Sequence, residues 1–273
     1  MIDIKEKLTV IFEDAGTLTN ISSSVAQFKD EITTQIDVIT DNFLYIGFYK
    51  PIKNFYIHFD TPTTDNINVF LQVFDGESWI DVVDFIDETN NFTKSGFISC
   101  LENSRPAEVD GNSLYFFRFR FDGIAADLKL GAVSMLLCSI NDISAVYPPV
   151  IQQDFRLGKQ SLHVALELSK NNIIQYLRNK GINTNDNKRL TVFDLLDVQE
   201  VRQAAAYKTI SQILLSVFNS PEDKFYILSE KFKEKAEELL KTYMLSIDYN
   251  QTGENNQSKF TFNSMRLVRW FKK

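Results

Sequence analysis

The sequence predicts an α+β protein of two parts, an antiparallel β-sandwich of jelly-roll type followed by an α-helical domain. Three observations lead to this prediction. Short apolar runs separated by turn residues fill the first half, apolar residues at helical spacing fill residues 197–243, and the charge changes sign between the halves. Residues 1–150 carry 10 Lys and Arg against 22 Asp and Glu, a net of −12, and the rest carries 19 against 14, a net of +5. This difference favours two bodies with different neighbours.

The strand candidates in the first half are short and closely spaced. The clearest is 114–121, LYFFRFRF, whose odd-numbered aromatic residues share one face while Arg118 and Arg120 share the other. Turn residues such as Asp75-Gly76 separate the runs, because glycine adopts positive φ without steric cost. The other candidates are 8–12, 32–38, 43–49, 55–59, 69–74, 79–85, 97–100 and 130–140.

Two adjacent prolines mark the predicted domain boundary. Pro148 and Pro149 fix the backbone and donate no hydrogen bonds, which is typical of a semi-rigid linker. We therefore predict a β-sandwich over residues 1–145, a linker over 146–160, a helical domain over 161–257 and a basic, aromatic C-terminal tail over 258–273.

The helical domain is predicted to centre on two antiparallel helices. Asp197 and Glu200 have the spacing of a capping box, and the helix they begin should reach about Phe218. A second helix should follow a Ser-Pro cap and extend to residue 243. Upstream, Ser169 is expected to cap a short helix that ends at Gly181, while residues 161–169 fit either a strand or the front of that helix.

Motifs for catalysis are missing from the sequence. It contains no G-x-S-x-G, H-E-x-x-H, paired C-x-x-C or P-loop pattern, so we expect no enzyme activity and no cofactor. His58 and His163 lie in apolar runs and are expected to be structural. Cys100 and Cys138 are expected to be buried free thiols. No secretory signal and no membrane-spanning run is evident, which favours a soluble protein made in a reducing compartment.

Acidic and aromatic clusters allow other interpretations. The stretch 248–254 imitates half of an EF-hand loop, but Lys259 occupies the position of the bidentate Glu, so we expect no metal there. The acids at 81–88 fit a solvated strand and turn better than a catalytic carboxylate pair. Most aromatic residues should pack in the core, yet an exposed patch that includes Trp79 and Tyr49 is an alternative site for stacking on a sugar ring.

The second half of the chain has a recognisable order of elements: a helix ending in Lys180-Gly181-Ile182, an Ala-rich helix with the sequence RQAAAY, a charged helix, a polar turn and a terminal tail. This order resembles the small helical head-to-tail connector (adaptor or head-completion) proteins of tailed bacteriophages over residues 168–273. The N-terminal sandwich resembles β-sandwich modules appended to virion proteins.

The resemblance implies a non-enzymatic virion structural protein of the head–tail neck, assembled in the host cytoplasm. Connector subunits form a homo-oligomeric, typically dodecameric ring beneath the portal protein and bridge to tail or neck proteins. Genomic DNA passes through the channel without sequence-specific contact, and no membrane is involved.

Apolar residues off the main helical stripe are expected to form the ring interface, namely Ala205, Tyr207, Leu215 and Phe218. The tail is expected to dock on the portal through Arg266, Leu267, Arg269, Trp270, Phe271 and Lys272. The alternative is a carbohydrate- or receptor-binding tail component, in which the sandwich carries the function.

Overall fold

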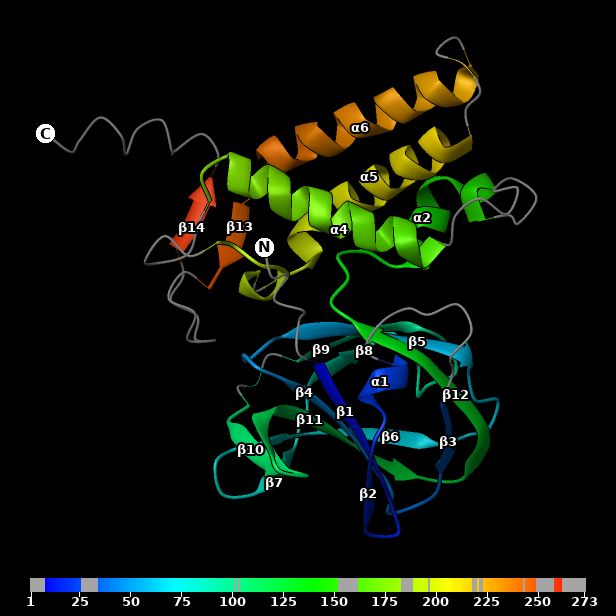
Figure 1. The fold of residues 1–273 in the computed structure, drawn as a ribbon, viewed down its shortest axis with the longest axis vertical. Helices are drawn as coiled ribbons and strands as arrows, with labels where there is room; N and C mark the ends of the chain where they lie inside the picture. The colour runs from blue at the N-terminus through cyan, green and yellow to red at the C-terminus, as the bar shows by residue number, and fades with distance from the viewer. Residues whose placement is uncertain are drawn as a thin grey trace, which may run out of the picture. The chain divides into compact units, whose positions relative to one another are not determined.

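The computed structural model describes residues 8–25, 34–100, 102, 104–151, 162–182, 189–195, 197–217, 220, 223–242, 244–248 and 258–261. The chain divides into two compact units, Met1–Met135 and Leu136–Lys273. The first unit is rich in strands and the second in helices, which confirms the predicted α+β composition (Figure 1). The division lies ten residues before the boundary predicted at residue 145.

The first unit is a sandwich of two antiparallel sheets. One has the order β2-β1-β4-β11-β6-β7, with β10 also paired to β11, and the other has the order β3-β12-β5-β9-β8. A short helix, α1 (Ser22–Val25), follows β2. The strands are β1 (Leu8–Asp14), β2 (Thr17–Asn20), β3 (Thr34–Val38), β4 (Phe43–Phe48), β5 (Asn54–Thr61), β6 (Asn68–Phe74), β7 (Trp79–Asp81), β8 (Phe85–Asp87), β9 (Gly96–Cys100), β10 (Pro106–Val109), β11 (Asn112–Asp122) and β12 (Ala125–Ser134).

Aromatic rings from the two sheets fill the space between them. Phe117 and Phe119 of β11 lie with their ring centroids 5.0 and 6.2 Å from that of Phe55 on β5. Phe92, from the loop before β9, lies 4.8 Å from Phe59 and 5.4 Å from Phe119. All five side chains are buried, so the odd-numbered face of β11 forms the predicted core face.

Phe92 reaches the core through an unusual turn. Asn90, Asn91 and Phe92 have φ angles of 52°, 55° and 64°, a left-handed conformation that costs about 1–3 kcal/mol per non-glycine residue. The Asp87 carboxylate stabilises the turn by accepting hydrogen bonds from the N–H groups of Thr89 and Asn91, both at 2.8 Å. Burial of the Phe92 ring offsets the backbone strain.

We predict that Phe92→Ala lowers the free energy of unfolding of the first unit by about 3–5 kcal/mol, because the ring is fully buried and the strained turn loses its compensation. Ile86→Ala, on β8 with its side chain 59% exposed, is the control and should change stability by no more than about 0.5 kcal/mol. Urea unfolding followed by fluorescence measures both. Equal midpoints for the two variants would contradict this account of the turn.

The second unit is built around helix α5 (Gln199–Val217). Residues on every side of this helix are buried, from Val201 near its start to Val217 at its end. Its antiparallel partner α6 (Lys224–Thr242) confirms the predicted helical hairpin. The remaining elements are α2 (Ile140–Val146), the 3-10 turns η1 (Pro148–Ile151) and η3 (Val192–Asp194), α4 (Leu162–Asn179), β13 (Met244–Ile247) and β14 (Ser258–Thr261).

Helix α4 is one continuous element from Leu162 to Asn179, not a short helix capped by Ser169. The Ser169 hydroxyl is buried and donates a hydrogen bond of 3.0 Å to the carbonyl of Ala205 in α5, so the residue joins two helices instead of starting one. The predicted end at Gly181 is confirmed. Its φ is 81°, and the N–H of Ile182 bonds the carbonyl of Leu177, as in a Schellman motif.

The predicted capping box at the start of α5 forms only in part. Asp197 caps the helix, with its Oδ1 accepting from the N–H of Gln199 at 2.8 Å. Glu200 does not complete the box, because its carboxylate accepts hydrogen bonds from the N–H and the hydroxyl of Ser246 in β13. The residue therefore joins α5 to the following strand instead of closing its own helix end.

The segment that follows the sandwich packs within the helical unit. Asp142 of α2 forms an ion pair of 2.8 Å with Arg202 of α5, and the Tyr147 ring lies 5.8 Å from that of Phe232 in α6. Where the sequence predicts a linker from residue 146, the structure has the end of α2 and the turn η1. The prolines begin this 3-10 turn, since their fixed φ suits its first positions.

Both cysteines are free and buried, as predicted. Cys138 lies 3.6 Å from the Thr209 hydroxyl, and burial raises the pKa of its thiol to about 12. A thiol held protonated in this way is a poor nucleophile. Among the helices that the structure describes, none combines the length and the hydropathy that a membrane crossing requires.

Candidate binding face on the seven-stranded sheet

The outer face of the seven-stranded sheet carries a row of side chains that crosses five strands. The strand register sets Ile11 opposite Tyr45, Tyr45 opposite Arg118, Arg118 opposite Gln72 and Gln72 opposite Asp81. Directly opposed residues of an antiparallel sheet lie on the same face with Cβ atoms about 5 Å apart. The five residues therefore form one continuous line across β1, β4, β11, β6 and β7.

Hydrogen bonds connect the polar members of this row. The Tyr45 hydroxyl donates to Glu13 at 2.6 Å, Arg118 Nε donates to Gln72 Oε1 at 2.7 Å, and Gln72 Nε2 donates to Asp81 at 2.7 Å. Burial and the bond to Glu13 raise the pKa of Tyr45 to about 12, although the neighbouring Arg118 acts in the opposite direction. Tyr45 therefore remains a phenol. From Tyr45 to Asp81 the row alternates neutral and charged groups, and Glu13, opposite Phe43 in the adjacent line of residues, bonds its Tyr45 end.

Aromatic rings hold the arginines of this face. The Arg118 guanidinium carbon lies 4.6 Å from the centroid of Phe43 and 4.5 Å from that of Trp79, so the group makes cation–π contacts with two rings. Arg120 lies 4.2 Å above Phe70 in the same manner. These five side chains are all half-buried, which leaves part of each in contact with solvent.

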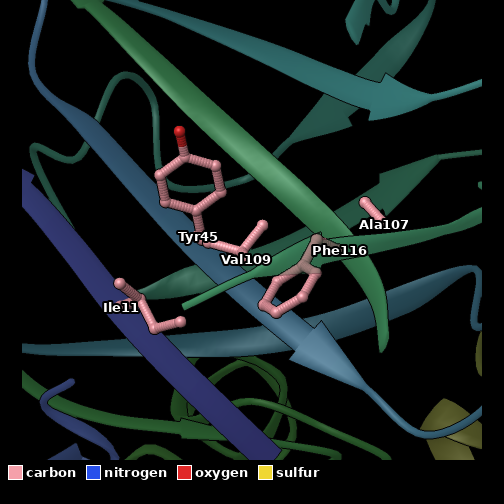
Figure 2. Packing of buried hydrophobic residues seen from close by; sticks show 5 residues of the cluster. All are labelled: Ile11, Tyr45, Ala107, Val109 and Phe116. Atoms are coloured by element: carbon pink, nitrogen blue, oxygen red, sulfur yellow. The ribbon is translucent and has the colours of Figure 1, made fainter. Parts of the chain in front are cut away.

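A buried apolar cluster supports the aromatic face. It consists of Ile11, Tyr45, Ala107, Val109 and Phe116, drawn in Figure 2, with Phe43, Phe74, Trp79 and Leu114 packed against it. The Phe116 ring lies directly over Gly47, where an added Cβ would come within 2.4 Å of the ring. The outer face therefore has a packed base of its own, which holds its aromatic and polar groups in fixed positions.

A second polar group lies on the five-stranded sheet. His58 Nε2 is 3.1 Å from Asp60, and His58 Nδ1 is 3.1 Å from the Ser95 hydroxyl. Ser95 Oγ also accepts the N–H of Phe59 at 2.9 Å, and Asp60 occupies space that a side chain at Gly131 would fill. The serine hydroxyl is engaged by the backbone of the neighbouring strand, so we assign this group a structural role, as predicted for His58.

We predict that His58 makes the protein less stable at mildly acidic pH. Burial lowers the pKa of His58 below its ordinary value of 6.5. Because the unfolded chain takes up the proton first, the free energy of unfolding should fall as pH decreases below about 6.5, down to the folded pKa. Urea unfolding at pH 7.5, 6.5 and 5.5 should show a smaller loss in His58→Asn than in the wild type. Parallel pH profiles would contradict the assignment.

Of the four residues predicted to form a ring interface, one is buried inside its own chain. Ala205 is wholly buried beneath α4, and the prediction for this residue is wrong, because its small side chain lets a helix of the same chain approach closely. Tyr207 stacks on Phe232 of α6, with centroids 5.9 Å apart. Leu215 is half-buried, and Phe218 lies outside the described residues.

The predicted docking tail is mostly beyond the described part of the chain. Residues 258–261 form β14, which pairs with β13 of the same chain. The predicted portal-docking residues lie outside the described residues, namely Arg266, Leu267, Arg269, Trp270, Phe271 and Lys272.

Of the two residues named for the predicted aromatic patch, Trp79 lies beside the row and Tyr49 does not. Tyr49 follows β4 and stands outside the row, with the Lys50 ammonium 5.7 Å from its ring. Of the acids at 81–88, Asp81 lies on β7 of one sheet and Asp87 on β8 of the other. Sequence reasoning missed Tyr45 and Gln72, whose only signal is their position opposite Arg118, and that position requires the strand order.

Within the ranges that the structure describes, no three His, Cys, Asp or Glu side chains gather closely enough to hold a metal ion. The EF-hand-like stretch is described only at Asp248, which is buried and donates its N–H to the carbonyl of Asp194.

Comparison with known proteins gives no family. No family model matches the sequence, and no curated protein matches it. Among solved structures, the sandwich is similar to the module CpGH89CBM32-6 of Clostridium perfringens, with 14% identity and a TM-score of 0.30 over 49% of this chain and 94% of that one. It is also similar to CBM32-1 from a family 31 glycoside hydrolase of the same organism, with 10% identity and a TM-score of 0.27 over 41% and 81%. At this similarity the likeness says nothing about the ligand of the present chain.

Proposed function

We propose that this chain is a non-catalytic binding protein whose β-sandwich recognises carbohydrate on the outer face of the seven-stranded sheet. The observation that supports the proposal is the row from Tyr45 to Asp81, flanked by the half-exposed rings of Phe43 and Trp79. On the solvent side of a sheet, this combination of rings and hydrogen-bonding groups exceeds what core packing requires.

The chemistry of the row suits a sugar. A pyranose ring has apolar C–H faces that pack on aromatic rings, and its hydroxyl groups both donate and accept hydrogen bonds. Trp79 and Phe43 supply the apolar surface, whereas Arg118 and the exposed Asp81 supply planar polar groups beside it. The buried Gln72 bonds both and holds them in place. Such planar side chains can contact two neighbouring hydroxyl groups at once.

The row is also rigid before any ligand binds. Its members lie within strands, and they are linked by the bonds of Arg118 to Gln72 and of Gln72 to Asp81. Groups that are already ordered lose little conformational entropy on binding, so weak individual contacts contribute more of their energy to affinity.

Replacement of Trp79 tests the proposal. Screening the full chain against a glycan array should identify a ligand, and Trp79→Ala should weaken its binding at least about tenfold, equivalent to about 1.4 kcal/mol. Trp79→Phe keeps a ring and the packing against Phe74, so its affinity should lie between those of the wild type and Trp79→Ala. Leu18→Ala, an exposed position on β2, is the control and should bind like the wild type. The proposal fails if no saccharide binds, or if Trp79→Ala binds with unchanged affinity while circular dichroism shows it folded.

The head-to-tail adaptor of a phage neck is a second proposal, for the helical unit. The observation that favours it is a pair of exposed apolar residues one turn apart on α4, Val164 and Leu168, exposed by 43% and 44%. A ring formed through this face should give particles several times heavier than the 31.5 kDa chain by light scattering. Val164→Asp together with Leu168→Asp should return them to monomers. A monomer at tens of micromolar wild-type protein would count against self-assembly.

A further inference from the structure

We propose that the ligand of this face is an acidic saccharide, whose carboxylate or sulfate groups are bound by Arg118 and Arg120. This inference rests on the proposed function and narrows it to a ligand class. It concerns the charge of the ligand, because the aromatic rings of the face would pack equally well on a neutral or an acidic sugar.

The first observation is that neither arginine has an acidic partner. The first 150 residues carry 22 Asp and Glu against 10 Lys and Arg, so a carboxylate partner is easily available in the sequence. Yet in the part of the chain that the structure describes, Arg118 contacts two rings and neutral hydrogen-bonding groups, and Arg120 contacts the ring of Phe70. An arginine in this setting normally pairs with a carboxylate.

The second observation is that the nearby acids are bonded to other groups. Glu13 accepts from the Tyr45 hydroxyl, and Asp81 accepts from the Gln72 amide. A neutral residue therefore lies between Arg118 and each of these acids. Both acids bond neutral donors and hold them in place, and neither makes a direct ion pair with the Arg118 guanidinium.

The third observation is that Arg118 is held by its neighbours before any ligand binds. The rings of Phe43 and Trp79 lie 4.6 and 4.5 Å from the guanidinium carbon, and Gln72 accepts the Nε–H. The other in-plane N–H groups suit the paired oxygens of a carboxylate or sulfate. A half-buried charge of this kind gains more from an anion than an exposed one does.

Arg120 adds a second charge beside the first. It is two residues further along β11 on the same face, roughly 7 Å away at the rise of an antiparallel strand. Two stacked guanidiniums at this separation match a chain that carries acidic groups on successive sugars. A neutral glycan would use the rings but neither charge.

Paired probes test the charge of the ligand. Calorimetry of the full chain would compare oligogalacturonate with its methyl ester, sialyllactose with lactose, and a heparin-derived tetrasaccharide with the first two acids. At least one acidic probe should bind ten or more times tighter than its neutral counterpart, and raising NaCl from 50 to 500 mM should reduce this preference. The heparin arm separates sulfate from carboxylate recognition.

Substitutions then assign the preference to the two arginines. Arg118→Gln and Arg120→Gln should each lower the acidic-over-neutral ratio severalfold, and Arg118→Lys should retain part of it, because lysine keeps the charge without the planar fork. Arg120 makes no hydrogen bond in the row, so Arg120→Gln should fold even if Arg118→Gln does not. The charge preference can then be measured with Arg120→Gln. Arg105→Gln, at an exposed position, changes the charge equally and should leave the ratio unaltered.

Three outcomes separate the two proposals. Equal or tighter binding of the neutral probe, with Trp79→Ala still harmful, overturns the acidic ligand and leaves carbohydrate binding in place. A preference for acid that both arginine variants retain also overturns the inference. If no saccharide of either charge binds, the proposed function itself is wrong.

Discussion

Strand β11 buries aromatic rings on both of its faces, and the rest of the sandwich depends on this constraint. Phe117 and Phe119 point into the space between the sheets, while Phe116 lies over Gly47 on the outer face. A slip of one residue in the pairing would exchange Phe119 with Arg118 and place a guanidinium in the aromatic core. The register of β11 is therefore fixed, and it fixes the order of Tyr45, Arg118 and Gln72 across three strands.

In the second unit, polar contacts join α5 to the elements that pack around it. Ser169 and Thr209 both donate to the carbonyl of Ala205, and Glu200 holds β13 through Ser246. Arg202 holds α2 through Asp142. These contacts close most of the helix surface within one chain. The small residues of α5 thus permit close neighbours, as their sequence indicates, but the neighbours are helices of the same subunit.

Much of the fold can be predicted from local pattern alone. Alternating apolar residues give nearly every core strand, and helical spacing gives α5 and α6 within two residues. The strands that the sequence did not predict have a common physical cause. Strand β2 is exposed throughout and β10 begins with proline, so each is a strand because of its pairing partner and not because of its own composition. The buried hydroxyl of Ser169 likewise imitates a helix cap until its partner carbonyl is known.

The residues of the candidate binding face also show what the sequence can predict and what it cannot. Trp79 and the arginines of β11 are visible in the sequence as an aromatic residue near a turn and an amphipathic strand. Tyr45 and Gln72 have no local signal, because each matters only through the residue opposite to it in another strand. Cross-strand register joins Tyr45 to Arg118, 73 residues apart (118 − 45), and Arg118 to Gln72, 46 residues apart, and no periodicity within one segment reports it.

The central claim is that this face of the sheet is where a ligand binds. The most direct measurement is chemical-shift mapping of the isotope-labelled full chain during titration with an oligosaccharide. The indole N–H of Trp79 and the Nε–H of Arg118 should shift together and saturate, with smaller changes at Tyr45 and Gln72. The account would be contradicted if the signals of Trp79 and Arg118 did not shift and saturable shifts appeared instead around His58, on the other sheet.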